Sequence, residues 1–275
     1  MLDGQRFNGG RGAMKRFFLA SVGLAALIAG PAMAADMRVA APPPPVAYYD
    51  WSGAYVGFNV GGVWHKTNVH FPTPGAAGLG IPGVNPDFSI NGSDGIYGFH
   101  AGAQWQWGAW VLGVEAALSG CMQECRESAA LPVGYFAANT SFETKMTNLF
   151  TLGPRLGYAF DRWMIFATGG WASANLKGTP CSTLTALCST AGPFIGASRN
   201  DGWYAGGGID YMVHKGPLVD VILGAEYQHY DVGGHRAFCI NPGCSPATGG
   251  DYDLSATGDI VRARLTIKTH GYGFL

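Results

Sequence analysis

The clearest pattern along the chain is a two-residue alternation of apolar with small or polar side chains between Thr147 and Ala174. Two alternating segments flank Asp161-Arg162, a connection with no room for a helix, so this stretch predicts a β-hairpin. One face of its first strand is apolar and the other is small or polar. The apolar face carries Phe150, Leu152, Leu156, Tyr158 and Phe160, and the other carries Thr151, Gly153, Arg155 and Gly157.

The same alternation recurs along the chain, and no segment has a helical pattern that could cover the apolar faces. Six further strands are predicted at residues 51–65, 94–107, 110–119, 201–213, 218–229 and 260–275. An apolar face with nothing to cover it is typical of strands that meet lipid, while the polar face lines a closed barrel. We therefore predict an all-β fold, an eight-stranded antiparallel up-and-down transmembrane β-barrel.

The connections between these strands alternate strictly between long and short. Long ones follow the first, third, fifth and seventh strands, and short ones follow the second, fourth and sixth. Outer-membrane barrels have long extracellular loops and short periplasmic turns. This order predicts that both termini face the periplasm and that all the cysteines lie outside the cell.

Composition supports a membrane barrel over a soluble domain. Only 13% of the residues are charged, aromatic residues reach 13%, and there are 43 glycines. A soluble surface normally carries about twice that share of charge. After the N-terminal segment, no stretch has the unbroken apolar run that a membrane helix requires.

The N-terminus predicts export. Lys15 and Arg16 precede an apolar run over 17–29, and Ala32-Met33-Ala34 follows as a small-x-small cleavage pattern, so we expect cleavage between Ala34 and Ala35.

Three segments follow from that cleavage site. Residues 1–34 are an N-terminal extension and signal peptide, residues 35–50 a Pro-rich periplasmic tether, and residues 51–275 the barrel. Cleavage removes four basic residues and one acidic residue, which moves the net charge from −1 to about −4. No nucleic-acid partner is expected.

The six cysteines of this exported chain predict disulfides within loops. Fifteen pairings can be written, and the local one is favoured because each pair falls in a different predicted loop. The local pairs are Cys121 with Cys125, Cys181 with Cys188, and Cys239 with Cys244. A zinc site from His229, His235, Cys239 and Cys244 is the weaker alternative, because close Cys-x-x-Cys spacing is absent.

Charged residues occur on the inward parity of several strands. They are Glu115, Arg155, Asp210, Glu226, Arg262, Arg264 and Lys268. Unpaired charges in a narrow lumen are costly, so we predict a salt-bridged, side-chain-filled interior. A small gated ion pathway is the alternative. Pro154 lies within a predicted strand and lacks an amide hydrogen, so a bulge or bend is expected there.

Several of these segments resemble one protein family. They are WSGAYVGFNVGGVW, with Trp51 and Trp64 expected in interfacial aromatic girdles, VLGVEAALS, RLGYAFDRWMIFATGG, and DGWYAGGGIDYMV followed by GAEYQHYDVGG. Together they look like the porin-like outer-membrane β-barrel family of Gram-negative bacteria, the group that contains small surface antigens.

The resemblance implies an eight-stranded barrel in the cell outer membrane, with a role in envelope integrity or surface contact and no shared catalytic residues. It also implies outer-membrane lipid and the barrel-insertion machinery as partners. Members usually end in an aromatic insertion signal, whereas this chain ends in Leu275.

Particular residues suggest alternative functions. An acid-base group of His229, Tyr230, Asp231, Asp251 and Asp253 has no accompanying nucleophile motif, so no enzyme is expected. Rim or loop histidines His65, His70 and His235 could ligate haem iron, which some relatives bind, although simple surface exposure is favoured. We therefore expect no cofactor and no metal, and keep a small-molecule or host ligand at the extracellular loops, or a small-solute porin, as the alternatives.

Overall fold

The computed structural model describes residues 49–70, 87–130, 140–182, 187–188, 196–237 and 252–270. Ten strands make up this part of the chain. They are β1 (Gly53–His70), β2 (Phe88–Trp107), β3 (Trp110–Cys121), β4 (Glu127–Ala130), β5 (Thr140–Phe160), β6 (Trp163–Ser182), β7 (Leu187–Cys188), β8 (Gly196–Lys215), β9 (Val219–Ala237) and β10 (Tyr252–Thr269).

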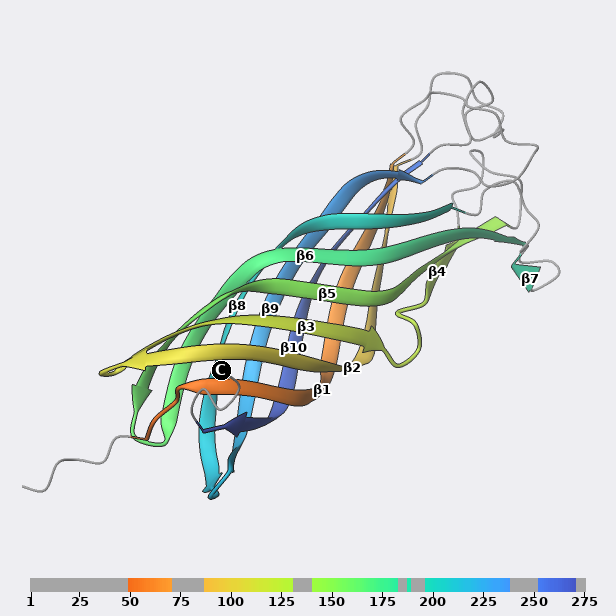
Figure 1. The fold of residues 1–275 in the computed structure, drawn as a ribbon. Helices are drawn as coiled ribbons and strands as arrows, with labels where there is room; N and C mark the ends of the chain where they lie inside the picture. The colour runs from red at the N-terminus through yellow and green to blue at the C-terminus, as the bar shows by residue number, and fades with distance from the viewer. Residues whose placement is uncertain are drawn as a thin grey trace, which may run out of the picture. The chain divides into compact units, whose positions relative to one another are not determined.

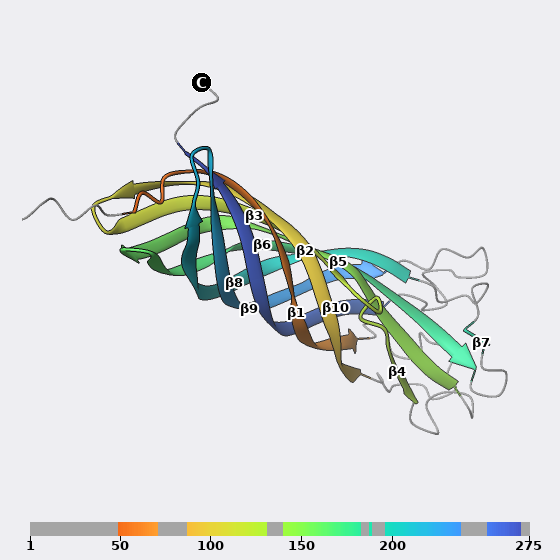
Figure 2. The same ribbon diagram turned by 90° about the horizontal axis from the view of Figure 1, so that it is seen from below.

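Eight of the ten strands form a closed ring. Antiparallel pairing runs β1–β2–β3–β5–β6–β8–β9–β10, and β10 pairs back onto β1, with Phe58 opposite Leu265. Figures 1 and 2 show these long strands side by side around the barrel, strongly tilted. The predicted eight-stranded antiparallel up-and-down barrel is confirmed. Closure gives each of these eight strands a partner on both sides.

The two short strands lie outside the ring. β4 pairs with β5 beyond the end of β3, and β7 pairs with the last residues of β6. Neither was predicted, because both fall inside segments that sequence reasoning treated as loops. Among the described residues, no helix is long and apolar enough to cross a membrane.

The barrel has two distinguishable ends. We call the end with the short turns after β2, β5 and β8 the turn end, and the opposite end the loop end. Side chains alternate between the two faces of the wall as predicted, and large apolar residues are exposed on the outside. Leu156, Tyr158 and Leu265 are each more than 40% exposed. They do not share a dry centre, so the outward apolar face is confirmed.

The strands are longer than predicted because their polarity inverts towards the loop end. On β1, outward residues change from Phe58 and Trp64 to Lys66, while inward residues change from Asn59 to the buried Val69. The same alternation continues with the apolar and polar faces exchanged. The structure extends seven of the eight barrel strands beyond this inversion, and β3 only to Cys121. Near the inversion lie the loop-side limits of the predicted strands at 51–65, 94–107, 147–174, 201–213, 218–229 and 260–275.

An outward ring of aromatic residues marks the inversion. Its members are Trp64, Tyr97, Trp171, Trp203 and Tyr227. A second outward aromatic group lies at the turn end and contains Trp107, Trp110, Tyr158, Trp163 and Tyr211. On β6, Trp163 and Trp171 are about 26 Å apart at about 3.3 Å per residue. With the usual tilt of about 40°, this separation corresponds to about 20 Å along the membrane normal, slightly less than the apolar band of about 25 Å that such barrels present to lipid.

Trp51 does not lie in the turn-end girdle, so that prediction was wrong. Its side chain is fully buried, and its backbone amide donates to Gln106 Oε1 at 2.7 Å. Gln104 Nε2 donates to the Trp51 carbonyl at 2.7 Å. Tyr49, in the predicted tether, and Trp51, directly before β1, therefore both pack into the barrel mouth. Trp64 is outward and exposed, as expected.

Pro154 does not produce the expected bulge. Its register with β3 is continuous, and the pairing of β5 with β6 has the same register on both sides of it. The missing amide is accommodated because Gly169 and Gly170 of β6 lie opposite, and Thr168 Oγ1 donates to the Pro154 carbonyl at 3.1 Å. The register shift in this strand pair lies between Met146 and Leu149. The expected end of the last strand also changes: β10 ends at Thr269, and Leu275 lies outside the described residues.

Inward glycines allow aromatic rings to lie flat against the wall. A Cβ on Gly102 would approach Tyr55 Oη to 2.5 Å, and one on Gly208 would approach the Phe166 ring to 2.7 Å. Since real Cβ atoms do not come so close, a larger residue would displace the ring. These two rings reach the charged residues at the centre of the barrel.

Candidate functional site inside the barrel

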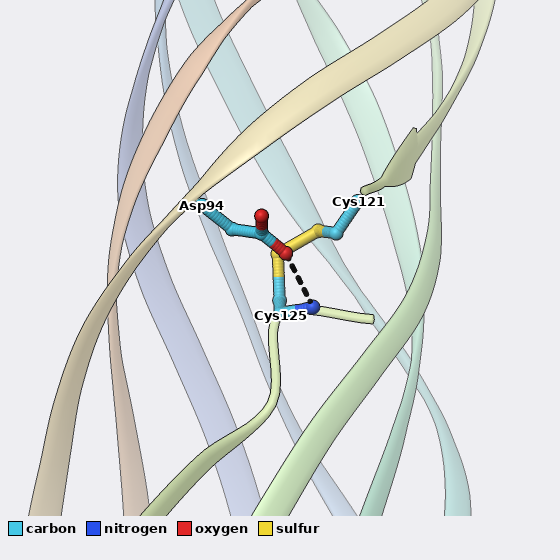
Figure 3. Close-up of side chains that lie close together, drawn as sticks. All are labelled: Asp94, Cys121 and Cys125. Carbon is cyan, nitrogen blue, oxygen red and sulfur yellow. Dashed lines mark hydrogen bonds between the residues drawn. A yellow bond between two sulfur atoms is a disulfide. The ribbon is translucent and has the colours of Figure 1, made fainter. Parts of the chain in front are cut away.

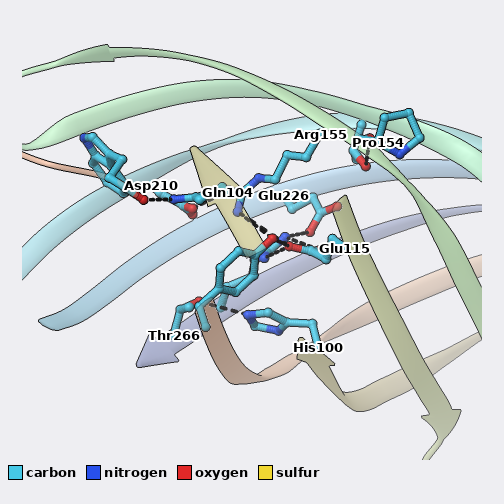
Figure 4. A network of polar contacts seen from close by, with 12 residues as sticks. His100, Gln104, Glu115, Pro154, Arg155, Asp210, Glu226 and Thr266 are labelled. Atoms are coloured by element: carbon cyan, nitrogen blue, oxygen red, sulfur yellow. Dashed lines mark hydrogen bonds and ion pairs between the residues drawn. The ribbon is translucent and has the colours of Figure 1, made fainter. Parts of the chain in front are cut away.

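Six charged side chains meet near the middle of the lumen, and we call them the central network. It consists of Glu115, Arg155, Asp210, Glu226, Arg262 and Arg264, contributed by β3, β5, β8, β9 and β10, and all are at most 5% exposed. Figure 4 shows the acids and arginines converging on one another from different sides of the wall.

Arg264 is the centre of this network. Its Nη1 and Nη2 donate to Glu115 Oε1 and Oε2 at 3.0 and 2.6 Å, a bidentate pair across the lumen. Nη1 also donates to Glu226 Oε2 at 2.5 Å. Arg262 Nε donates to the same Glu226 oxygen at 3.1 Å. Two carboxylates therefore hold two adjacent guanidinium groups of β10.

Arg155 completes the network from the other side. It forms an ion pair with Asp210, and its Nη1 lies 3.5 Å from Glu115 Oε2. Tyr55 donates its hydroxyl to Glu115 Oε2 at 2.9 Å. Three acids and three arginines give no net charge, so each buried charge has an opposite partner, as low dielectric surroundings require.

The Phe166 ring fills the space between two of the guanidinium groups. Arg155 Cζ lies 3.8 Å and Arg264 Cζ 5.4 Å from the ring centroid, within cation–π range. His100 lies at the turn-end side of the network, where its Nε2 is 2.9 Å from Thr266 Oγ1. Polar and aromatic side chains thus occupy the described lumen at this level.

Lys268 is buried and inward but belongs to a separate group at the turn end. Its Nζ lies 3.2 Å from Asp220 Oδ2 and donates to the carbonyls of Asp50 and Ser52 at 3.0 and 3.1 Å. Tyr49 donates its hydroxyl to Asp220 Oδ2 at 2.5 Å. Burial and then the Asp220 carboxylate raise the pKa of the Tyr49 phenol well above its usual range.

Apolar layers close the lumen on both sides of the central network. The turn-end core contains Tyr49, Trp51, Val111, Ala159, Met164, Phe166, Met212 and Ile222. The loop-end core is larger and includes Val63, Val69, Ile90, Ile96, Phe142, Met146, Leu149, Leu176, Tyr204, Tyr230, Val232, Leu254 and Ile260. Inward polar residues were expected along the whole barrel, whereas the structure places the six charges of the central network between two apolar cores, with the Lys268–Asp220 pair separate at the turn end.

Two of the predicted disulfide candidates are joined in the structure. Cys121 and Cys125 form a disulfide at the loop-end tip of β3. Figure 3 shows Asp94 of β2 beside it. Asp94 Oδ2 accepts from the amides of Gln123 and Cys125 at 2.8 and 3.0 Å, so its carboxylate holds the turn rather than a metal ion. Hydrogen bonds from Arg126 and Lys145 lower the pKa of the neighbouring Glu124.

The other cysteines are described only in part. The backbone of β6 places Cys181 directly opposite Cys188 of β7, a position that suits the predicted pairing. Cys239 and Cys244 lie outside the described residues, as do Ala34, Ala35 and the segments 1–34 and 35–48. Those pairings, the zinc alternative and the cleavage site stay predictions.

The candidate catalytic residues of β9 lie on opposite faces of the wall. Tyr230 is fully buried inside, whereas His229 and Asp231 face outward. His229 Nδ1 instead lies 2.9 Å from Asp259 Oδ1 of β10. Asp253 lies at the start of β10, and Asp251 is outside the described residues. Strand alternation thus separates residues that are adjacent in sequence.

The candidate haem ligands are also dispersed. His65 is not a rim residue, since its ring is buried inside the barrel. His70 is exposed, with Nδ1 2.8 Å from Asp87 Oδ1. The side chain of His235 lies outside the described part.

The predicted set of lumen residues did not include Tyr55, Phe166 and Asp220, although their inward parity and apolar or acidic character could have indicated them.

Comparison with known proteins identifies the fold's family. The family model described as "Outer membrane protein beta-barrel domain" matches residues 22–258, most of the chain. This protein belongs to that outer-membrane β-barrel family. Outer-membrane barrels in general have short periplasmic turns and longer extracellular loops. The loop end of this outer-membrane protein is therefore the extracellular end.

Curated relatives agree with this family. The chain is 29% identical over 231 residues to the 31 kDa outer-membrane immunogenic protein of Brucella melitensis biotype 1, covering 80% of this chain and 88% of the relative. The protein of the same name from Brucella suis biovar 1 gives the same values.

Solved outer-membrane barrels are more distant. The outer membrane protease OmpT from Escherichia coli matches with 9% identity and a TM-score of 0.40, covering 78% of this chain and 96% of that one. OprG from Pseudomonas aeruginosa matches with 9% identity and a TM-score of 0.39, covering 80% and 97%.

Proposed function

We propose that this outer-membrane β-barrel is a closed structural and surface-contact protein that supports envelope integrity, rather than a porin or an enzyme. The filled lumen is the observation that carries the proposal. A turn-end core, the central network and a loop-end core follow one another along the barrel axis. A solute would have to displace buried Trp51, Arg264 or Leu254 to pass, and each is at most 2% exposed.

The extracellular extension supports the surface-contact part of the proposal. β5 is 21 residues long, whereas a barrel strand crosses a membrane in about 9–11 residues. The strands therefore continue outside the membrane, with polar residues outward and the loop-end core inside. Such a rigid, dry-cored extension suits the display of extracellular loops. The immunogenic name of the Brucella relatives is in keeping with surface exposure.

The absence of catalysis is proposed from the arrangement of the candidate residues. Tyr230 faces the lumen, and His229 is engaged by Asp259 on the outer face, so the group weighed from the sequence does not converge. The buried position of His65 likewise removes one of the three histidines considered for haem. A host or small-molecule ligand at the loops is not part of this proposal.

Cells lacking the protein test the proposal. We expect a deletion strain to become more sensitive to detergents and to large antibiotics, and complementation with the wild-type chain to restore resistance. On intact cells, an antibody or a membrane-impermeant label should reach the extracellular end. An unchanged deletion strain together with no labelling of intact cells would contradict the proposal.

A further inference from the structure

A polar surface pocket lies at the extracellular aromatic ring, on the outside of the wall. Its volume is about 330 Å³, and it lies over β9, β10, β1 and β2. The outward side chains that line it are Trp64, Lys66, Asn91, His229, Thr257 and Asp259. The ring marks the level at which the outer face changes from apolar to polar, so this pocket faces lipid headgroups rather than acyl chains or bulk water.

Cross-strand register places the pocket's polar groups side by side. Lys66 of β1 lies directly between Asn91 of β2 and Thr257 of β10. In the next outward row, Trp64 lies opposite Asp259, which in turn lies opposite His229. An ammonium, an amide, a hydroxyl and an imidazole therefore share one depression of the wall.

The electrostatics favour an anionic group beside Lys66. Among the described residues, no carboxylate forms an ion pair with the Lys66 ammonium, and its cross-strand neighbours Asn91 and Thr257 are neutral. Asp259 is already engaged, because Tyr227 donates to its Oδ1 at 2.6 Å and His229 Nδ1 lies 2.9 Å from it. That contact leaves His229 Nε2 for a ligand. Asp231, opposite Thr257 on β9, bounds the site on its far side.

We propose that this pocket binds the phosphate headgroup of a lipid in the outer leaflet, with a preference for a phosphomonoester over a zwitterionic diester. Lys66 would donate to the phosphate oxygens, a hydroxyl of the phosphomonoester would donate to His229 Nε2, and Asn91 and Thr257 would add hydrogen bonds. Trp64 and Trp203, whose ring lies 5.6 Å from that of His229, would flank the glycerol or sugar region. The apolar groove of about 590 Å³ lower on the wall would accept acyl chains of any lipid and would add no headgroup preference.

Native mass spectrometry of the refolded full-length protein in detergent micelles tests this inference. Phosphatidic acid and phosphatidylcholine with identical acyl chains serve as the probes. We expect the wild type to bind phosphatidic acid more tightly, and K66Q to lose about five-fold in that preference, since a basic residue near an anionic headgroup contributes about that factor. H229Q should also lower the preference, because it removes the imidazole that would accept from the phosphomonoester hydroxyl.

Lys177 provides the matched control, because it is also an exposed, outward lysine of the extension but lies on β6, away from the pocket. K177Q should keep the preference of the wild type. Equal losses in K66Q and K177Q, or unchanged binding in both K66Q and H229Q, would overturn the proposal. Inorganic phosphate at the same concentration should not displace the lipid; full displacement would show a phosphate site and not a lipid site.

Discussion

Replacing Glu226 by Gln tests the central network at the carboxylate that Arg262 and Arg264 share. Glu226 Oε2 accepts from Arg262 and Arg264, while Arg264 also holds Glu115. After E226Q, Arg264 keeps its bidentate partner, but Arg262 is left with Ser119 Oγ at 3.4 Å, a neutral acceptor. The balance of three acids and three arginines becomes one net positive charge in a buried layer.

The expected loss is large because the volume of the side chain hardly changes. Breaking a buried ion pair by removing one partner typically costs about 3–5 kcal/mol, and no cavity is created by an isosteric amide. We therefore expect E226Q to lower the free energy of unfolding by about 3–5 kcal/mol. Urea unfolding in phospholipid vesicles, followed by tryptophan fluorescence, measures this quantity.

Two further variants separate the effect of the buried charge from the effect of replacing any glutamate. E124Q removes an exposed carboxylate that pairs with Arg126 and Lys145, and should cost far less than E226Q because solvent screens these pairs. The double variant E226Q/R262Q restores the charge balance, so its cost should be smaller than the sum of the two single costs by about 1–3 kcal/mol. If E226Q costs no more than E124Q, the lumen is wet and screened, and the reasoning fails.

Three other predictions follow from the wall and the mouth of the barrel. W51A should lower stability by about 3–5 kcal/mol in the same assay, because a fully buried aromatic side chain is removed from the turn-end core; a loss under 1 kcal/mol would mean that this segment does not pack there. G102A should lower the temperature at which folded protein is lost in heat-modifiability gels, since the added Cβ meets Tyr55; an unchanged temperature would refute the close approach. L265R should cost about 2–4 kcal/mol, and T257R above the aromatic ring at most about 1 kcal/mol; equal costs would contradict the assigned membrane level.

The period of two and the loop order made most of the fold predictable from sequence. Alternation assigns each residue to a face without reference to its partners, so the outward position of Leu265 and the inward position of Arg264 both followed directly. Strand order followed because up-and-down barrels pair consecutive strands. The closing pair of β1 with β10 then required only that the sheet have no edge.

The ends of the strands could not be predicted in the same way. Beyond Trp64, the outward positions of β1 become polar, so a pattern that requires apolar residues outward ends there although the strand continues to His70. Outside the membrane, water replaces lipid as the outer solvent and the dry side moves inward. The two-residue alternation continues through this change, and the sequence interpretation erred only in requiring the apolar side chains to stay on the outer face.

The sequence predicted which charged residues face the lumen, but not which of them pair with one another. Inward parity gave the charges that surround Arg264, but parity does not say how far along the axis each strand is staggered. Lys268 therefore joined Asp220 at the turn end and not the central network. Trp51 was misplaced because it precedes the first strand, where alternation no longer applies and its burial depends on Gln104 and Gln106.

The closed lumen is tested most directly by the conductance of the refolded, full-length protein in a planar lipid bilayer. Three filled layers between the periplasmic and extracellular mouths predict no steady current above the leak of the bare membrane, across the voltages that the bilayer tolerates. A reproducible open step that scales with salt concentration and persists in the wild-type chain would contradict the closed barrel and restore the porin alternative.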